Sequence, residues 1–211
     1  APSSDAVKVE ELPPAPDAAQ PSVVTIIADP IAADVRQRLA RIGSSLAKDE
    51  RQALLQYYAV DGAKPLWATD KALSPRGLAL QAELQKADDW GLQSRDFELP
   101  AGLGADASPE QLGDAELKLS LAALKYARFA RGRRVDPTQL STYLDRKAQL
   151  LPPKRVFDEL RTAAEPDTYL RGLHPQHPQF EKLRQAFLAL RDMPAPVTDA
   201  TPDEPKIAKS T

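Results

Sequence analysis

The chain has 211 residues, of which 42% are hydrophobic and 27% charged, with a formal net charge of −2 and no cysteine. This length allows one sizeable hydrophobic core or two small ones, and the near-neutral charge argues against a polycation that binds nucleic acid or anionic lipid. The lack of cysteine excludes disulfides, zinc–thiolate sites and a cysteine nucleophile within the chain, and no apolar run approaches the ~20 residues of a membrane helix.

Proline-rich segments flank the body of the chain. Residues 1–30 and 193–211 combine prolines with alanines and acids and show no apolar period, so both are predicted to be disordered tails or linkers. The body is therefore expected to span residues 31–192. A start at Ala1 followed by such a stretch is typical of an exported protein whose leader has been removed, although a trimmed chain would look the same.

The first half of the body shows helical spacing of its apolar residues. Residues 31–46 carry an apolar residue every three or four positions, and residues 49–62 continue the pattern until Gly62, a plausible stop. A third run begins at Ser74, where an N-cap belongs, with Pro75 in the first helical position. Gly91 is expected to end this third run.

The run DAELKLSLAALKYARFARG is predicted to form the central helix. Asp114 is expected as its N-cap and Gly132 as its C-terminal residue, and its apolar side chains point nearly all round, which is typical of a buried helix. Further caps are expected at Asp136-Pro137 and near His177-Pro178. No segment alternates like a strand, so the fold class is predicted to be all-α: a single irregular bundle of about six or seven helices with disordered proline-rich tails.

The sequence offers little chemistry. His174 and His177 lie together in LHPQHPQF, but no acid is close enough in sequence to complete a metal site, and a helix-capping loop is the favoured interpretation. Two histidines in one loop also leave poor options for a serine triad, and no glycine-rich phosphate loop is present. No catalytic residue, metal site or cofactor is therefore predicted.

The two tryptophans each allow two interpretations. Trp67 follows Pro65 and Leu66 in an expected loop, and Trp90 precedes Gly91. Either ring could stack on a sugar. The favoured interpretation is a loop tryptophan folded over helix ends, where it buries a large apolar area.

A series of short motifs runs in a fixed order through the body. They are Ala59-x-x-Gly62-x-x-Pro65-Leu66-Trp67, Leu73-Ser74-Pro75-Arg76, Ala87-x-x-x-Gly91-Leu92 with Asp96-Phe97, Asp114-Ala115-Glu116-Leu117-x-Leu119-Ser120, Tyr126-Ala127-Arg128, Gly132-Arg133-x-x-Asp136-Pro137, and Leu173-x-Pro175-x-His177-Pro178-Gln179-Phe180-x-x-Leu183-Arg184. In this order and spacing they resemble the N-terminal scaffold domain of the large periplasmic L,D-transpeptidases (YcbB-type) of peptidoglycan cross-linking. The resemblance covers roughly residues 31–192.

The resemblance implies a non-catalytic scaffold in the bacterial periplasm. Enzymes of that family attack a stem-peptide carbonyl with a cysteine thiolate, paired with a histidine, in a catalytic domain later in the chain. No residue here can take that role, so this chain is expected to be inactive while the intact parent is an L,D-transpeptidase. The implied partners are the catalytic domain of the same parent, peptidoglycan and other cell-wall enzymes. The alternative is a free-standing periplasmic adaptor that binds peptidoglycan or protein.

Four arginines crowd the stretch YARFARGRRVDP. Arg128 and Arg131 fall at the end of the predicted central helix, where cations interact favourably with the helix dipole. Arg133 and Arg134 follow Gly132 and could satisfy helix-end carbonyls or pair with an acid. A structural role is favoured over contact with peptidoglycan or a partner domain, and nucleic acid is the least favoured ligand. Together with Trp67, these arginines form the candidate contact surface.

Overall fold

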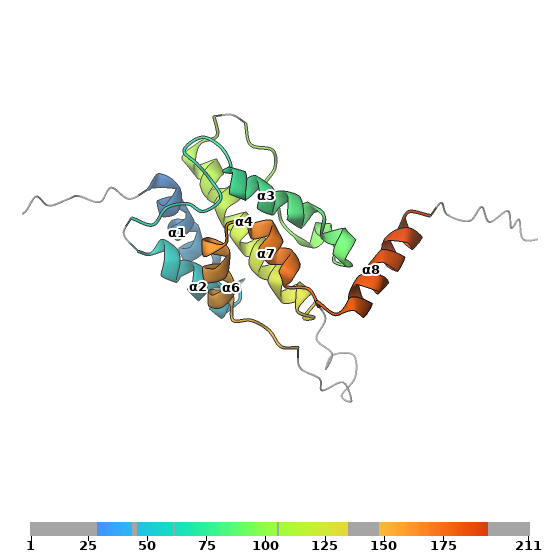
Figure 1. Ribbon diagram of the computed structural model, residues 1–211. Helices are drawn as coiled ribbons and strands as arrows, with labels where there is room; N and C mark the ends of the chain where they lie inside the picture. The colour runs from blue at the N-terminus through green and yellow to red at the C-terminus, as the bar shows by residue number, and fades with distance from the viewer. Residues whose placement is uncertain (1–28, 44–45, 61, 105, 135–147, 194–211) are drawn as a thin grey trace, which may run out of the picture.

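The computed structural model describes residues 29–43, 46–60, 62–104, 106–134 and 148–193. The described residues form seven α-helices and two short 3₁₀ helices, which confirms the predicted all-α class (Figure 1). In chain order these are α1 (Pro30–Ile42), α2 (Lys48–Tyr58), α3 (Pro75–Gln85), η2 (Ala87–Trp90), η3 (Ser94–Asp96), α4 (Pro109–Ala130), α6 (Pro153–Thr162), α7 (Pro166–Gly172) and α8 (Pro178–Arg191). The tails predicted to be disordered, apart from the few residues at their inner ends, and the cap predicted at Asp136-Pro137 lie outside the described residues.

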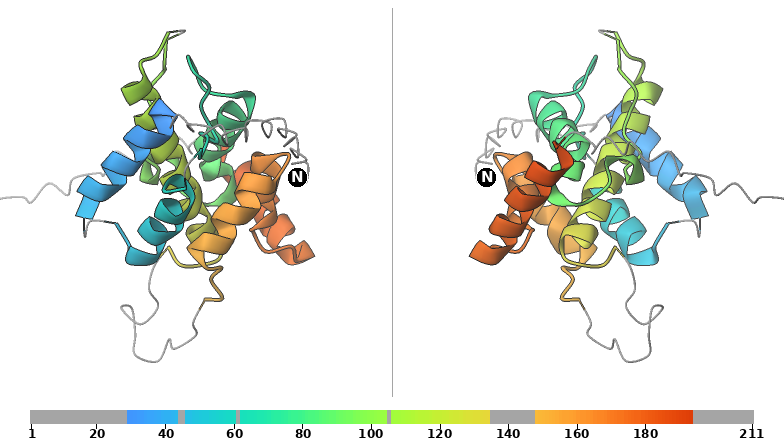
Figure 2. Two further views of the ribbon diagram at one scale, coloured as in Figure 1. Left: turned by 90° about the vertical axis from the view of Figure 1, so that its left-hand side faces the viewer. Right: turned by 90° about the vertical axis from the view of Figure 1, so that its right-hand side faces the viewer.

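Helix α4 is the axis of the bundle. It is 22 residues long, and its buried residues lie on nearly every side, as its apolar sequence predicted. Helices α1, α2, α3, α6 and α7 all pack against it, so that it runs through the middle of the body in Figures 1 and 2. Because α4 contacts helices from both halves of the chain, it holds the domain together.

The N-terminus of α4 differs from the prediction. The helix begins at Pro109, and its N-cap is Ser108, whose hydroxyl accepts a hydrogen bond from the backbone N–H of Gln111 while the Gln111 side chain bonds back to the backbone of Ser108. This capping box satisfies two donors that would otherwise have no partner at the helix start. The prediction of Asp114 as the N-cap was therefore wrong: Asp114 lies inside the helix, five residues after Pro109, and pairs with Arg38 at 3.1 Å.

Other helix ends follow the sequence signals. Ser74 caps α3 by accepting from the N–H of Gly77 at 3.1 Å. Helix α3 itself ends at Gln85, before the expected stop, and Gly91 ends the following η2 segment in the left-handed conformation with φ 72°. The Nδ1 atom of His177 accepts from the N–H of Gln179 at 3.2 Å, which confirms the cap predicted for α8. Gly132, with φ 90°, follows the last residues of α4 as expected.

The apolar stripe predicted to run through residues 31–46 as one helix is interrupted in the structure. Helix α1 ends at Ile42, because Gly43 takes φ 60°, and Leu46 lies beyond the break, packed on the core. Helix α2 likewise ends at Tyr58, before the expected stop at Gly62.

Helix α8 lies apart from the other helices. None of its residues is buried, and its packing on the body is mainly through the short η2 segment. In Figure 1 it projects from the end of the molecule opposite α1 and α2. The core therefore ends before α8 begins.

Candidate interaction surface

Trp67 belongs to the core and not to the surface. Its side chain is fully buried, and its indole N–H donates to the hydroxyl of Ser120 on α4 at 2.9 Å. The ring offers no exposed face on which a sugar could stack. The structure thus removes Trp67 from the candidate contact surface and agrees with the interpretation that it folds over the helix ends to bury apolar area.

A buried carboxylate anchors the loop that carries Trp67. Glu116 of α4 is wholly buried and accepts from the hydroxyl of Tyr58 at 2.6 Å. It also accepts three backbone N–H groups of the loop, those of Leu66, Trp67 and Ala68, at 2.5, 2.8 and 3.0 Å. We call this arrangement the Glu116 clamp.

The electrostatics of the Glu116 clamp indicate a structural role. Burial raises the pKa of Glu116, while the four donors act in the opposite direction by stabilising its charged form. Burial, together with the nearby Glu116, raises the pKa of Tyr58 well above its ordinary value. Since no substrate could reach this carboxylate, its work is to fasten α2 and the loop to α4. Sequence reasoning missed it, although an acid in the middle of an all-round apolar helix signals a buried partner.

Two of the four arginines have structural partners. Arg128 pairs with Glu50 of α2 at 2.9 Å, and Arg134 pairs with Asp96 of η3 at 3.3 Å. Burial raises the pKa of Glu50, and the guanidinium of Arg128 acts against that rise. Both arginines therefore tie the end of α4 to neighbouring elements. This agrees with a structural role for them.

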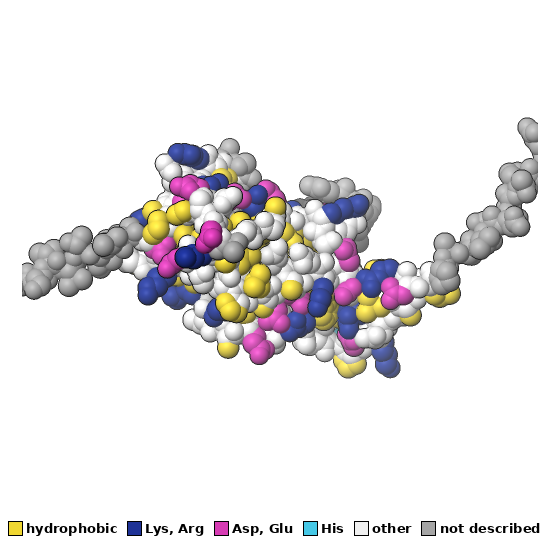
Figure 3. Space-filling model, turned by 90° about the horizontal axis from the view of Figure 1, so that it is seen from above, with side chains coloured by type: hydrophobic (Ala, Val, Ile, Leu, Met, Phe, Trp, Pro, Cys, Tyr) yellow, Lys and Arg dark blue, Asp and Glu magenta, His cyan; other side chains and the backbone are white. Residues whose placement is uncertain are grey.

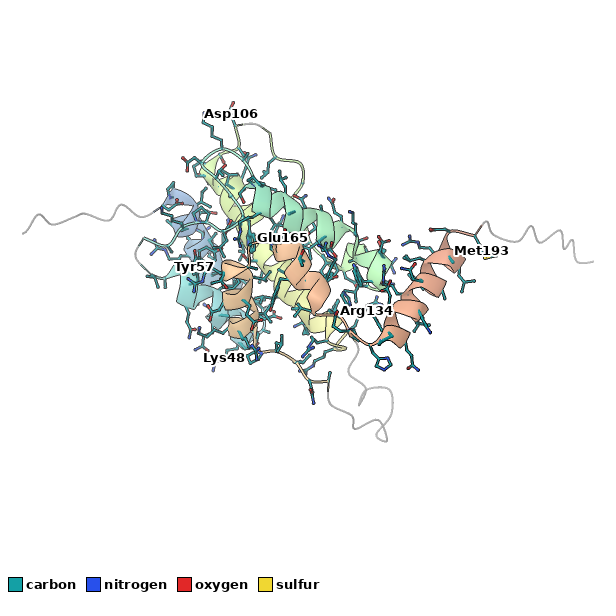
Figure 4. All side chains as sticks on the ribbon, viewed as in Figure 1. Lys48, Tyr57, Asp106, Arg134, Glu165 and Met193 are labelled. Atoms are coloured by element: carbon teal, nitrogen blue, oxygen red, sulfur yellow. The ribbon has the colours of Figure 1, made fainter. Side chains whose placement is uncertain are left out.

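The other two arginines face solvent. Arg131 is the C-cap residue of α4 and Arg133 follows Gly132, and both are exposed. Among the described residues neither guanidinium makes a hydrogen bond or an ion pair. Arg134, labelled in Figure 4, marks where this end of α4 reaches the surface. Of the four clustered arginines, two therefore pair with acids of other elements and two remain exposed.

The two histidines have different surroundings. His177 is exposed and caps α8, whereas His174 is only 3% exposed, with its Nε2 atom 2.7 Å from the hydroxyl of Tyr126. Burial, with a smaller contribution from the nearby Arg184, lowers the pKa of His174 to about 4, so the ring is neutral at pH 7. The described residues contain no group of three His, Cys, Asp or Glu side chains able to hold a metal ion.

Trp90 forms the junction between the body and α8. His174 stacks on its ring with centroids 4.6 Å apart, and the guanidinium of Arg184 on α8 lies 4.5 Å from the ring centroid. The indole N–H donates to Glu83 at 3.1 Å. Because these two neighbours cover its ring, Trp90 is also a poor platform for a sugar.

Two hollows flank this junction. One, of about 400 Å³, has a mixed polar and apolar lining: Trp90, Thr168, Arg171, Gly172, Pro175, Gln176, His177, Pro178, Phe180 and Glu181. The other, of about 310 Å³, is mainly apolar and is lined by Trp90, Gly91, Phe180, Leu183, Arg184 and Phe187. We call the second one the α8 groove.

An exposed apolar strip continues from the α8 groove along the helix. We define the α8 stripe as the exposed residues Leu183, Ala186, Phe187, Leu190 and Met193. Leu183 and Leu190, two turns apart on the same face of the helix, are 70% and 69% exposed, which is high for leucine side chains. In Figure 3 apolar side chains lie along the lobe that α8 forms at the right. This surface could not be predicted from the sequence, because apolar spacing alone does not show whether a stripe is covered by other elements.

Among the described residues, no helix is both long enough and apolar enough to cross a bilayer.

The fold and these surfaces define a class of protein: a helical framework assembled round one buried helix, with buried polar groups that fasten elements together. The comparison with known families is consistent with that class. The model of the Scaffold domain family matches residues 52–187, well over half of the chain, and the chain belongs to this family. Comparisons with curated proteins and with solved structures found no match.

Proposed function

We propose that this chain is the non-catalytic scaffold domain of a periplasmic L,D-transpeptidase that cross-links or remodels peptidoglycan. Membership of the Scaffold domain family supports a scaffold role. The link to L,D-transpeptidases comes from the ordered motifs of the sequence, which fall in and around the matched region. The domain would hold the catalytic domain of the same parent protein in place.

The main support for the proposal is that the motif residues make structural contacts within the domain. Trp67 and Glu116 build the clamp on α4, Ser74 and His177 cap helices, and Tyr126 bonds to the buried His174. Each of these residues supports the framework and none faces a substrate. Motifs of this kind specify a fold that positions another domain, and they do not specify chemistry of their own.

The composition indicates which part of the reaction this chain cannot supply. The chain has no cysteine, so the thiolate that attacks the stem peptide must come from the partner domain. The scaffold would contribute a fixed geometry. Two exposed cations, Arg131 and Arg133, are suited to bind the carboxylates of stem peptides or an acidic patch of the partner domain.

The first test concerns the partner domain. The purified chain is mixed with an L,D-transpeptidase catalytic domain from the same parent, and binding is followed by calorimetry and cross-linking by analysis of muropeptides. We expect no turnover by the chain alone, and binding that raises the activity of the catalytic domain. Turnover by the chain alone, or no binding to the catalytic domain, would contradict the proposal.

The exposed arginines allow a second test. We expect the chain to sediment with purified sacculi, and the double variant Arg131→Gln, Arg133→Gln to sediment less. The matched control is Lys71→Gln with Lys154→Gln, two exposed cations elsewhere, at 77% and 62% side-chain exposure. Sedimentation that is lost equally in both double variants would show a nonspecific charge effect. Sedimentation without binding to any catalytic domain would favour the alternative, a free-standing adaptor.

A further inference from the structure

A buried histidine lies where α8 meets the rest of the domain. His174 follows α7, in the link that leads to α8, and its side chain is 3% exposed. The rings of Trp90 on η2 and Phe180 on α8 stack on the His174 ring, with centroids 4.6 and 5.9 Å away. The ring of Tyr126 on α4 meets it edge-on at 5.4 Å. The burial of His174 therefore depends in part on α8 staying in place.

Helix α8 also brings a cation close to His174. The guanidinium of Arg184 lies 4.5 Å from the centroid of Trp90, the ring on which His174 stacks. Because like charges repel, Arg184 disfavours a protonated His174 as long as α8 is docked. Burial, the larger cause, and Arg184 together hold the pKa of His174 at about 4, and α8 contributes to both through Phe180 and Arg184.

The other groups around His174 do not supply a compensating negative charge. The hydroxyl of Tyr126 lies 2.7 Å from its Nε2 atom, and burial raises the pKa of Tyr126, so this group stays uncharged. Glu83 of α3 accepts from the indole N–H of Trp90 and pairs with Arg171 of α7 at 2.7 Å. Among the described residues no carboxylate bonds to the His174 ring. A proton on His174 would therefore be poorly stabilised in the docked arrangement.

The ion pairs that α8 makes lie at the surface. Arg191 pairs with Asp89 of η2 at 2.7 Å, with 40% and 39% of the two side chains exposed. Within α8, Glu181 pairs with Arg184 at 2.8 Å, and Lys182 is exposed without a partner among the described residues. Exposed ion pairs contribute little to stability. The docking of α8 therefore depends mainly on its contacts at the aromatic junction.

We propose that His174 and α8 form a pH-sensitive switch, in which protonation of the His174 ring releases α8 from Trp90. This inference goes beyond the scaffold role and does not depend on it. A released α8 no longer covers the ring with Phe180 or places Arg184 beside it, so the released state binds the proton more tightly and acid increases its population. Between pH ~6.5 and ~4, where only the released state binds the proton, the equilibrium constant for release rises by up to about 300-fold.

The test follows the motion of α8 with a spin label, which the lack of native cysteine allows to be attached at a single position. The variant Ala189→Cys, on the exposed side of α8, reports on that helix, and Ala82→Cys, exposed on α3, reports on the body. We expect the label at position 189 to gain mobility between pH ~6.5 and ~4 while the label at position 82 does not. Equal gains at both positions would mean that the whole domain unfolds, and no gain at either would mean that α8 stays docked; both results would overturn the switch.

Two variants identify the group that titrates. His174→Gln keeps a polar side chain next to Tyr126 but cannot take up a proton in this range, so the gain in mobility at position 189 should disappear. His177→Gln is the matched control, because His177 is an exposed histidine of the same link whose Nδ1 atom caps α8, and the transition should remain. A transition that persists in His174→Gln, or that is lost only in His177→Gln, would contradict the assignment to His174.

The wild-type chain provides a check that does not depend on the folding of any variant. The ring protons of its two histidines, followed by NMR, give two separate titrations. The midpoint of α8 release should coincide with the titration of His174. A midpoint that follows His177 instead would overturn the proposal.

Discussion

Helices α4 and α8 both carry apolar residues at helical spacing, yet they end up in opposite environments. Helix α4 is buried on nearly all sides and receives five other helices, whereas α8 has no buried residue and is held mainly through η2. The difference lies in what surrounds the apolar residues. In α4 they cover nearly the whole circumference, and its buried polar side chains are matched by partners from other elements. In α8 they form one stripe beside charges that reach back to the body.

The buried contacts that stabilise the fold lie mainly around α4. The Glu116 clamp, the Ser108 cap and the Tyr126–His174 contact all involve α4 or its start. By contrast, the contacts of α8 include the exposed Arg191–Asp89 pair and the covering of Trp90 by Arg184. Exposed ion pairs contribute little. Substitutions should therefore affect stability strongly in the first region and weakly in the second.

The largest effect is expected for Glu116→Gln. The amide would replace one acceptor oxygen with a donor, so that some of the four donors that converge on Glu116 would lose their partner in a dry environment. We expect the free energy of unfolding to fall by about 2–4 kcal/mol, measured by urea denaturation. Glu98→Gln is the control, because Glu98 has 82% of its side chain exposed. Equal unfolding midpoints for the two variants would contradict the clamp.

His174, at the junction between the two regions, predicts a pH dependence. Its pKa is about 4 in the folded protein against 6.5 ordinarily, so the unfolded chain binds more protons between these values. Stability is then fully present above pH ~6.5 and decreases as the pH falls toward ~4, by up to about 3 kcal/mol. Urea unfolding at several pH values measures this loss, which should be much smaller in His174→Gln. Parallel pH profiles for the two proteins would show that His174 is not responsible.

A smaller effect on stability is expected at the start of α4, where Ser108 is the observed N-cap and Asp114 was the predicted one. Ser108→Ala removes the observed cap and should lower the free energy of unfolding by about 0.5–2 kcal/mol. Asp114→Ala removes only partly exposed ion pairs with Arg38 and Lys118, and should cost less than about 1 kcal/mol. Thermal melts compare the two variants. A larger loss for Asp114→Ala would restore it as the more important residue.

The smallest effect on stability is expected in α8. Leu190→Ala should change the free energy of unfolding by less than about 0.5 kcal/mol, because the side chain is 69% exposed. Leu119→Ala is the comparison, since Leu119 lies fully buried in α4, and a loss of about 2–5 kcal/mol is expected there. Urea unfolding measures both losses. A similar loss at both positions would mean that α8 belongs to the folding core.

Several elements could be predicted because their signals are local. The caps at Ser74 and His177, the stop at Gly91 and the buried character of α4 all depend on residues within one or two turns. The predicted cap of α4 was wrong for a local reason too: Asp114 precedes the apolar run, but Ser108, Pro109 and Gln111 supply a complete capping box six residues earlier. The start of α4 is therefore also encoded locally.

The candidate surface could be predicted only in part. The arginines were found as a cluster, yet their sequence does not say that Arg128 and Arg134 meet Glu50 and Asp96 while Arg131 and Arg133 stay exposed. Those partners come from α2 and η3, tens of residues away. From the sequence, Trp67 could be either a stacking platform for a sugar or a core residue. Its burial against α4 shows that it is a core residue.

The sequence by itself determined the all-α class, several helix ends and the absence of a cysteine nucleophile, because these depend on composition and on interactions between near neighbours. Only the tertiary structure decided that Glu116 is a clamp, that His174 is buried and neutral, and that α8 presents an uncovered stripe. Burial is a property of what packs against a side chain from elsewhere in the chain. The same apolar spacing therefore yields a core in α4 and an open surface in α8.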